Sequence, residues 1–193
     1  MKSTYEARAL KFARILCALF ADCVTLGDFV NAIEGYNYTH TRELKYAHGV
    51  SRMAIIRADY VIKFDMAPVG CFKDGRAGNI ESELAVYERA VLDGYAYLLA
   101  KTTVGEYDGI RFAIMPRVDH VHDEDRWYGD YLTEDEMDWL EENVKDLHDG
   151  NLGYRRNKPV IIDYAWDAEE RCDSWTESTS STSEPSIFSG FFY

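Results

Sequence analysis

The sequence predicts an α+β domain, and the order of its helix-like and strand-like patterns carries that prediction. Helical periodicity fills residues 3–35, and short strand-like runs follow between residues 44 and 64. A long amphipathic pattern over 79–101 then predicts a helix, with two further strands around 102–104 and 111–115. A chain of 193 residues is large enough to bury a core as one domain or one small bilobed unit.

The first part of the chain is expected to form two helices and then three strands. Apolar residues from Leu10 to Val24 make a broad helical face, and Thr25 or Asp28 can cap a second, short helix through Phe29 to Ile33. The predicted strands lie at 45–47, 53–56 and 60–64, with a turn at His48-Gly49 between the first two. Residues 65–79 contain one proline and three glycines and are expected to form a loop.

The later elements are predicted from capping and turn residues. Asn79 is a candidate cap for the long helix, and Asp108-Gly109 is expected to turn the chain between two strands. Thr133, with Glu136 three residues later, forms the sequence pattern of a capping box and predicts a helix to about Val144. The Ser/Thr-rich C-terminal tail has the composition of a disordered segment.

The composition excludes some function classes. A net charge of -13 disfavours proteins that bind nucleic-acid phosphates or anionic membranes, whereas basic proteins remain possible partners. The four cysteines are scattered without metal-ligand spacing and are expected to be reduced thiols. No segment is long and apolar enough to span a bilayer, so we expect a soluble, cytoplasmic protein.

Three polar residues form the most informative motif of the chain. Asp146 is followed five residues later by Asn151, and Asp163 ends the apolar run Val160-Ile161-Ile162. Phosphoryl transfer needs a carboxylate that orients the attacking hydroxyl and two oxygen ligands for magnesium on the nucleotide phosphates. This spacing is therefore typical of a phosphotransferase site, although the motif alone also fits an acidic turn before an unrelated strand.

The motif resembles the catalytic loop of the protein-kinase-like superfamily, and this resemblance implies that Asp146 is the catalytic base and that Asn151 and Asp163 are metal ligands. Its form D-L-H-x-G-N is similar to small phage-encoded serine/threonine kinases and kinase-like phosphotransferases, in which the His (here His148) supports the loop. The resemblance covers roughly residues 40 to 166. It implies that Lys63 grips the nucleotide phosphates and that Glu83 holds Lys63 in place, with Glu81 and Glu88 as alternatives for the glutamate.

The resemblance also implies a nucleotide pocket and its cofactors, ATP and Mg²⁺. Met115 is expected at the back of the pocket, and the backbone groups of Pro116 and Val118 are expected to meet the adenine. Gly49 and Ser51 lie in the turn that corresponds to the nucleotide loop of the family.

The family resemblance predicts a bilobal fold with a reduced second lobe. We expect N-terminal helices (1–36), a small lobe with a mostly antiparallel sheet (37–117), a truncated helical large lobe with the catalytic loop (118–170), and a disordered tail (171–193). The chain departs from the family in three places: the nucleotide loop has one glycine, Val144-Lys145 replaces His-Arg before the catalytic Asp, and Asp163-Tyr164-Ala165 lacks the glycine of D-F-G.

Two function classes follow from these features. The first is an ATP- and magnesium-dependent serine/threonine kinase of the phage type, which modifies a host protein in the bacterial cytoplasm and can phosphorylate its own Ser/Thr-rich tail. The second is a kinase-like binding protein that inhibits or redirects a host protein through its acidic surface or tail. A small-molecule phosphotransferase is disfavoured, because the chain lacks helices to wall a second pocket. The oligomeric state stays open.

Overall fold

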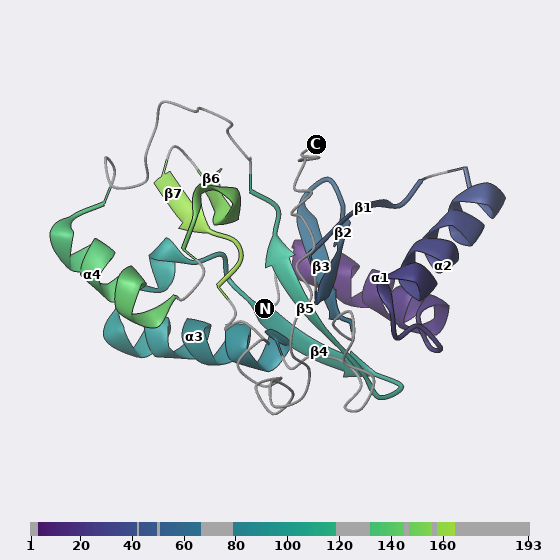
Figure 1. The fold of residues 1–193 in the computed structure, drawn as a ribbon, viewed down its shortest axis with the longest axis horizontal. Coiled ribbons are helices and arrows are strands. Elements are labelled where there is room, and N and C mark those ends of the chain that lie inside the picture. The colour runs from purple at the N-terminus through teal and green to yellow at the C-terminus, as the bar shows by residue number, and fades with distance from the viewer. Residues whose placement is uncertain are drawn as a thin grey trace, which may run out of the picture.

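The computed structural model describes most of the chain up to residue 164. The described residues are 4–41, 43–49, 51–66, 79–118, 132–144, 147–155 and 158–164. The helices and strands, in chain order, are α1 (Thr4–Leu19), α2 (Leu26–Thr39), β1 (Lys45–His48), β2 (Arg52–Ile56), β3 (Tyr60–Asp65), α3 (Asn79–Asp93), β4 (Thr103–Tyr107), β5 (Ile110–Pro116), α4 (Glu134–Asn143), β6 (Leu152–Arg155) and β7 (Lys158–Ile161). The order confirms a mixed α+β fold (Figure 1).

An antiparallel sheet of five strands forms the centre of the fold. Its strand order is β1-β2-β3-β5-β4, so β3 and β5 pair directly although α3 and β4 lie between them in sequence. The β4–β5 connection is a two-residue turn in which Asp108 and Gly109 both have positive φ (51° and 76°). This conformation matches a type I′ hairpin turn and confirms the turn expected at Asp108-Gly109.

The two N-terminal helices pack on one face of the sheet. One hydrophobic core joins α1 and α2 to β2, β3 and β5, and Figure 1 shows both helices on the same side of the sheet. Phe20, directly after α1, and Phe29 of α2 meet Phe64 of β3, with ring centroids 5.1 and 6.5 Å away respectively. Thr25 caps α2 in a capping box with Asp28, so both residues considered for this cap contribute to it.

The opposite face of the sheet carries α3, which leads into a second core. In that core α3 packs with α4, with the β6–β7 hairpin and with Met115 of β5. The backbone N–H of Ala100 donates to the Ile161 carbonyl (2.8 Å), which ties the chain after α3 to the end of β7. In Figure 1, α4 and the β6–β7 hairpin lie on the far side of the molecule from α1 and α2.

Two predicted elements differ from the structure. The helix expected over 79–101 ends at Asp93, because Gly94 has φ 86°, a left-handed conformation that stops a helix. The apolar run before Asp163 is expected as a single strand but forms half of a hairpin, β6–β7. Tyr154-Arg155 and Lys158-Pro159 make this hairpin hard to see in the sequence, because charge and proline interrupt the apolar pattern.

Several expectations fall outside the described residues. These are the tail (171–193), most of the loop at 65–79, and Asp146 with Lys145. Among the described helices, no stretch has the length and hydropathy that crossing a membrane requires.

Candidate functional site

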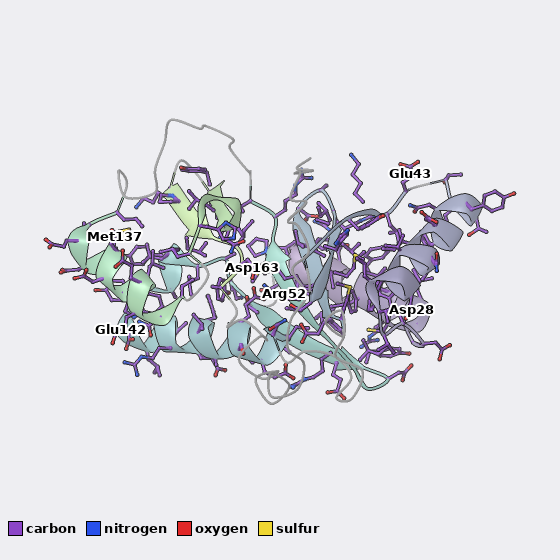
Figure 2. All side chains as sticks on the ribbon, in the orientation of Figure 1. Asp28, Glu43, Arg52, Met137, Glu142 and Asp163 are labelled. Atoms are coloured by element: carbon purple, nitrogen blue, oxygen red, sulfur yellow. The ribbon has the colours of Figure 1, made fainter. Side chains whose placement is uncertain are left out.

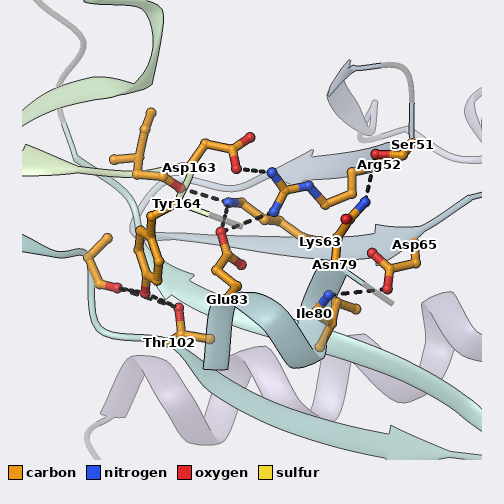
Figure 3. A network of polar contacts seen from close by, with 12 residues as sticks. Ser51, Arg52, Lys63, Asp65, Asn79, Ile80, Glu83, Thr102, Asp163 and Tyr164 are labelled. Atoms are coloured by element: carbon orange, nitrogen blue, oxygen red, sulfur yellow. Dashed lines mark hydrogen bonds and ion pairs between the residues drawn. The ribbon is translucent and has the colours of Figure 1, made fainter. Parts of the chain in front are cut away.

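A buried ion pair connects the sheet to α3. The Nζ atom of Lys63 lies 2.6 Å from Oε1 of Glu83, and the two residues are 7 % and 0 % exposed. The structure therefore brings together the lysine and the glutamate that the family resemblance selects, whereas Glu81 pairs with Arg111 at the surface. A buried ion pair requires good geometry and additional hydrogen bonds to offset the loss of hydration. Figure 3 shows such a network around this pair.

The pleat of β3 explains why Lys63 points away from the main core. Ile62 and Phe64 face α1 and α2, so the side chain of Lys63, between them in sequence, projects from the opposite face. Glu83 lies on the buried side of α3, one turn after the start of that helix. Strand alternation and helix periodicity thus direct the two side chains toward the same space.

The start of α3 is held by two contacts with the sheet. The Ile80 backbone N–H donates to Oδ2 of Asp65 (3.2 Å), and the Asn79 side-chain amide donates to the Ser51 hydroxyl (2.6 Å). Asn79 is the cap expected from the sequence, but the carboxylate that accepts from this first turn belongs to Asp65 at the end of β3. These contacts fix the position of α3, and with it that of Glu83.

Lys63 also contacts the segment that carries Asp163. Its Nζ donates to the Ile162 carbonyl (2.7 Å), a contact between residues 99 positions apart. The Ile162 N–H donates in turn to the Asn151 carbonyl (2.8 Å), so the two expected metal ligands lie on adjoining segments. The structure therefore gathers Lys63, Glu83, Asn151 and Asp163 around one region of the molecule.

Arg52 is a member of the site that the sequence motifs do not indicate. Its guanidinium contacts Glu83 through Nη1 (3.1 Å) and Asp163 through Nη2. Figure 2 shows Arg52 and Asp163 close together in the middle of the molecule, and Figure 3 draws both ion pairs. The β2–β3 register explains why Arg52 belongs to the site. Ala54 lies opposite Lys63, and Arg52, two residues before Ala54, lies opposite Asp65, so Arg52 and Lys63 are on the same face of the sheet.

Burial lowers the pKa of Lys63, the lysine at the centre of this network. Removal from water lowers the pKa of Lys63 to about 8, although the neighbouring Glu83 carboxylate opposes the shift. Because that value lies near neutral pH, the charge of Lys63 is sensitive to conditions that leave exposed lysines fully protonated.

Asp65 is perturbed in the opposite sense. Burial raises its pKa to about 7, and the Ile80 N–H only partly offsets this shift. Its Oδ1 atom has no hydrogen-bond partner among the described residues. The ionised form of Asp65 is therefore unfavourable in the fold.

Asp65→Asn is expected to remove a pH dependence of stability. With a pKa of about 7 in the fold and 3.8 as the ordinary value, the native state binds the additional proton. The free energy of unfolding of the wild type should therefore fall as pH rises from about 4 to 7. Urea unfolding between pH 4 and 8 should show this fall relative to Asp65→Asn. Asp108→Asn removes a carboxylate at an exposed turn position and serves as the control. If the free energy of unfolding has the same pH dependence in the wild type and in Asp65→Asn, the raised pKa of Asp65 is contradicted.

Tyr164 anchors the residue next to Asp163. Its side chain is 0 % exposed, its hydroxyl donates to the Ala100 carbonyl (2.6 Å), and the Thr102 hydroxyl is a second partner. Burial raises the pKa of Tyr164 well above its ordinary value, so the phenol stays neutral and continues to donate. A tyrosine after Asp163 thus fixes the backbone that carries the carboxylate.

Tyr164→Phe should destabilise the protein by about 1–3 kcal/mol, because the buried Ala100 carbonyl and the Thr102 hydroxyl each lose their shorter hydrogen bond and keep only a contact of 3.5 Å with each other. Denaturant midpoints measure the loss. Tyr38→Phe removes a hydroxyl from a side chain that is 93 % exposed and should change stability little. Equal effects of the two substitutions would show that the Tyr164 hydroxyl contributes nothing.

The expected nucleotide-pocket residues lie at the junction of the two cores. Met115 is buried and packs in the second core, and Pro116 ends β5 opposite Tyr60. Val118 packs against Gly153 of β6, where a Cβ atom in place of the glycine hydrogen would approach Val118 Cγ2 to 2.2 Å, so only glycine fits. The segment 115–118 therefore leads from the central sheet to a contact with the β6–β7 hairpin.

In the turn between β1 and β2, the polar groups of Gly49 and Ser51 already have partners within the protein. The Gly49 N–H donates to the Arg52 carbonyl (3.0 Å), and the Ser51 hydroxyl accepts from the Asn79 side-chain amide. His148 supports its own loop, as expected, because its Nδ1 accepts from the Gly150 N–H (2.9 Å) and its carbonyl accepts from the Asn151 N–H. Asp146, the expected base, lies just before this described segment, outside the residues that the structure describes.

The donor set suits magnesium better than a transition metal. Asp163 and Asn151 offer oxygen atoms, and Mg²⁺ is commonly bound by one or two carboxylates together with substrate phosphates and water. Within the described part of the chain, no group of three or more His, Cys, Asp or Glu side chains is arranged to hold a metal by itself. The residues present thus fit a cation that arrives with phosphate ligands.

Comparisons with known proteins yield partial matches to solved structures. No protein-family model and no curated protein matches the sequence. Two solved structures of WbdD are similar in part: one of the bifunctional kinase-methyltransferase (TM-score 0.38, 15% identity) and one of its complex with the kinase inhibitor LY294002 (TM-score 0.35, 13% identity). Each match covers 64% of this chain, and the chain spans about a third of each WbdD chain (34% and 32%). The chemistry of this chain therefore has to be inferred from its own side chains.

Proposed function

We propose that this protein is a kinase-like phosphotransferase that uses ATP with magnesium and transfers phosphate to serine or threonine. The observation that carries the proposal is the buried contact of Lys63 with Glu83 and with the Ile162 carbonyl beside Asp163. A structural ion pair needs no such link to a segment 99 residues away. A phosphate-binding lysine must lie near the metal ligand, because both act on the same phosphates, and this contact places Lys63 beside the residue before Asp163.

Each residue has a role in this proposal. Lys63 would bind the nucleotide phosphates, and Glu83 would keep its ammonium group in position. Asp163 and Asn151 would hold magnesium, which neutralises charge on the phosphates when bound. Asp146 would accept the proton of the attacking hydroxyl. The backbone at 115–118 would receive the adenine.

The acceptor is proposed to be a protein. Beyond residue 118, the described residues form only α4 and the β6–β7 hairpin with its short preceding turn, which offers little to enclose a small acceptor. A host protein, or the Ser/Thr-rich tail of this chain, is the proposed substrate, as for the phage-type kinases that the motif resembles.

Two measurements test the proposal. ATP with magnesium should raise the melting temperature more than either component alone, because ligand binding to the folded state stabilises it. Labelled ATP should transfer its γ-phosphate to the protein or to a bacterial lysate, and Asp146→Ala and Lys63→Ala should abolish the transfer. A wild type that shows no stabilisation by ATP with magnesium and no label transfer would overturn the proposal.

A kinase-like binding protein is the second candidate, and the ion pair between Arg52 and Asp163 favours it. In this alternative the carboxylate serves the fold instead of a metal, and the acidic surface recruits a basic partner. The absence of label transfer to any acceptor, with no added stabilisation when magnesium accompanies ATP, would support this second function over the first.

A further inference from the structure

Arg52 occupies a position that the proposed function does not explain. The side chain comes from the first residue of β2, and only 13% of it is exposed. Its two terminal nitrogens contact different carboxylates, Glu83 on α3 and Asp163 after β7. A planar guanidinium suits such two-sided contacts, and it suits phosphate equally well.

The turn beside Arg52 has one glycine where the family has a glycine-rich nucleotide loop. It contains one glycine, Gly49, and the N–H of that glycine is already bonded to the Arg52 carbonyl. The turn therefore offers fewer free backbone donors than a glycine-rich loop. Arg52 and Lys63 instead place two cationic side chains on the sheet face toward α3.

Asp163 cannot serve Arg52 and magnesium equally well. A divalent cation on this carboxylate would lie within a few ångströms of the guanidinium, and like charges at that separation repel in a partly buried site. Releasing Arg52 from Asp163 therefore favours the metal. The released guanidinium then needs another anion, and the nucleotide phosphates supply one.

We propose that Arg52 is a phosphate-binding residue of the nucleotide site and that its guanidinium exchanges between Asp163 and the nucleotide phosphates. The inference rests on the proposed function, which supplies the nucleotide and the metal. Arg52 thus takes over the task of the missing glycine-loop amides. It also makes metal and nucleotide binding favour each other, because both require the same movement of Arg52, away from Asp163 and toward the phosphates.

The first test measures metal binding without nucleotide. In Arg52→Gln, the metal no longer competes with Arg52 for Asp163. The affinity for Mn²⁺ should therefore rise about three- to fivefold, the effect expected for loss of a partly exposed ion pair. Electron paramagnetic resonance of the free ion measures this affinity. Arg89→Gln is the matched control, since it removes an exposed arginine that is paired with Asp93. Equal Mn²⁺ affinity in Arg52→Gln and Arg89→Gln would overturn the exchange.

The second test measures nucleotide binding by calorimetry. Arg52→Gln should bind a non-hydrolysable ATP analogue with Mg²⁺ about 10- to 100-fold more weakly, as expected for loss of charge-assisted hydrogen bonds. Arg52→Lys should recover part of that affinity because it keeps the charge. Unchanged affinity in Arg52→Gln would overturn the phosphate role.

The third test approaches the same ion pair from its other side, and it does not depend on the folding of an Arg52 variant. Asp163→Asn frees Arg52, so this variant should bind ATP in the presence of a chelator more tightly than the wild type does. Equal binding of metal-free ATP would overturn the inference. A wild type that binds no nucleotide at all would instead overturn the proposed function, so the two failures are distinguishable.

Discussion

Lys63→Met is expected to lower the rate of phosphoryl transfer by a factor on the order of 10²–10³, the usual effect of removing one charged or polar group that stabilises the transition state. The methionine keeps most of the length of the side chain but loses the ammonium group that meets Glu83 and the Ile162 carbonyl. Rates of label transfer at saturating ATP measure the effect. Lys45→Met is the matched control, because Lys45 is also a strand lysine but is exposed on β1.

The lowered pKa of Lys63 adds a second, sharper expectation. Since the pKa of Lys63 is about 8 in the fold and 10.5 ordinarily, the unfolded chain binds the additional proton between these values. The contribution of Lys63 to stability should therefore rise as pH increases from about 8 to 10. The affinity for ATP should fall over the first part of that range, because the charge that attracts the phosphates is lost. Lys63→Met should show neither trend, and a pH-independent ATP affinity in the wild type would refute the role of the lysine.

Much of this site can be predicted from the sequence because its residues lie on regular elements. Lys63 lies on a strand with clear alternation, and Glu83 lies on a helix with clear periodicity, so each side chain has a defined direction. The family resemblance favours Glu83 over Glu81 and Glu88. The structure gives the physical basis of that preference, since Glu83 is the one of the three that α3 buries.

The parts that cannot be predicted depend on contacts between distant segments. Arg52 has no local motif: its partner Glu83 lies 31 residues away along the chain, and its partner Asp163 is farther still. Asp65 takes its place at the start of α3 only when β3 and α3 pack together, so local sequence favours Asn79 as the cap. The β6–β7 hairpin cannot be predicted from the sequence because proline and charged residues interrupt the apolar pattern of its strands.

Phe64→Ala is expected to have the largest effect on stability, about 3–5 kcal/mol, because it removes a large side chain from a packed core. Phe64 is fully buried, and its ring meets Phe20 after α1, Phe29 of α2, and Phe112 of β5. The substitution leaves a cavity between the sheet and both N-terminal helices. Urea unfolding measures the loss, and Tyr38→Ala, at an exposed position on α2, should change stability little.

The same substitution tests whether the N-terminal helices unfold together with the sheet that carries the proposed nucleotide site. Phe64 follows Lys63 directly, so the strand that buries Phe64 against α1 and α2 is the strand that presents Lys63 to α3. If the helices and the sheet unfold together, Phe64→Ala should lower the stability of both in one cooperative transition. It should also weaken ATP binding in proportion to the fraction unfolded. Separate transitions for helix loss and for loss of ATP binding would show instead that α1 and α2 are an independent unit attached to the sheet.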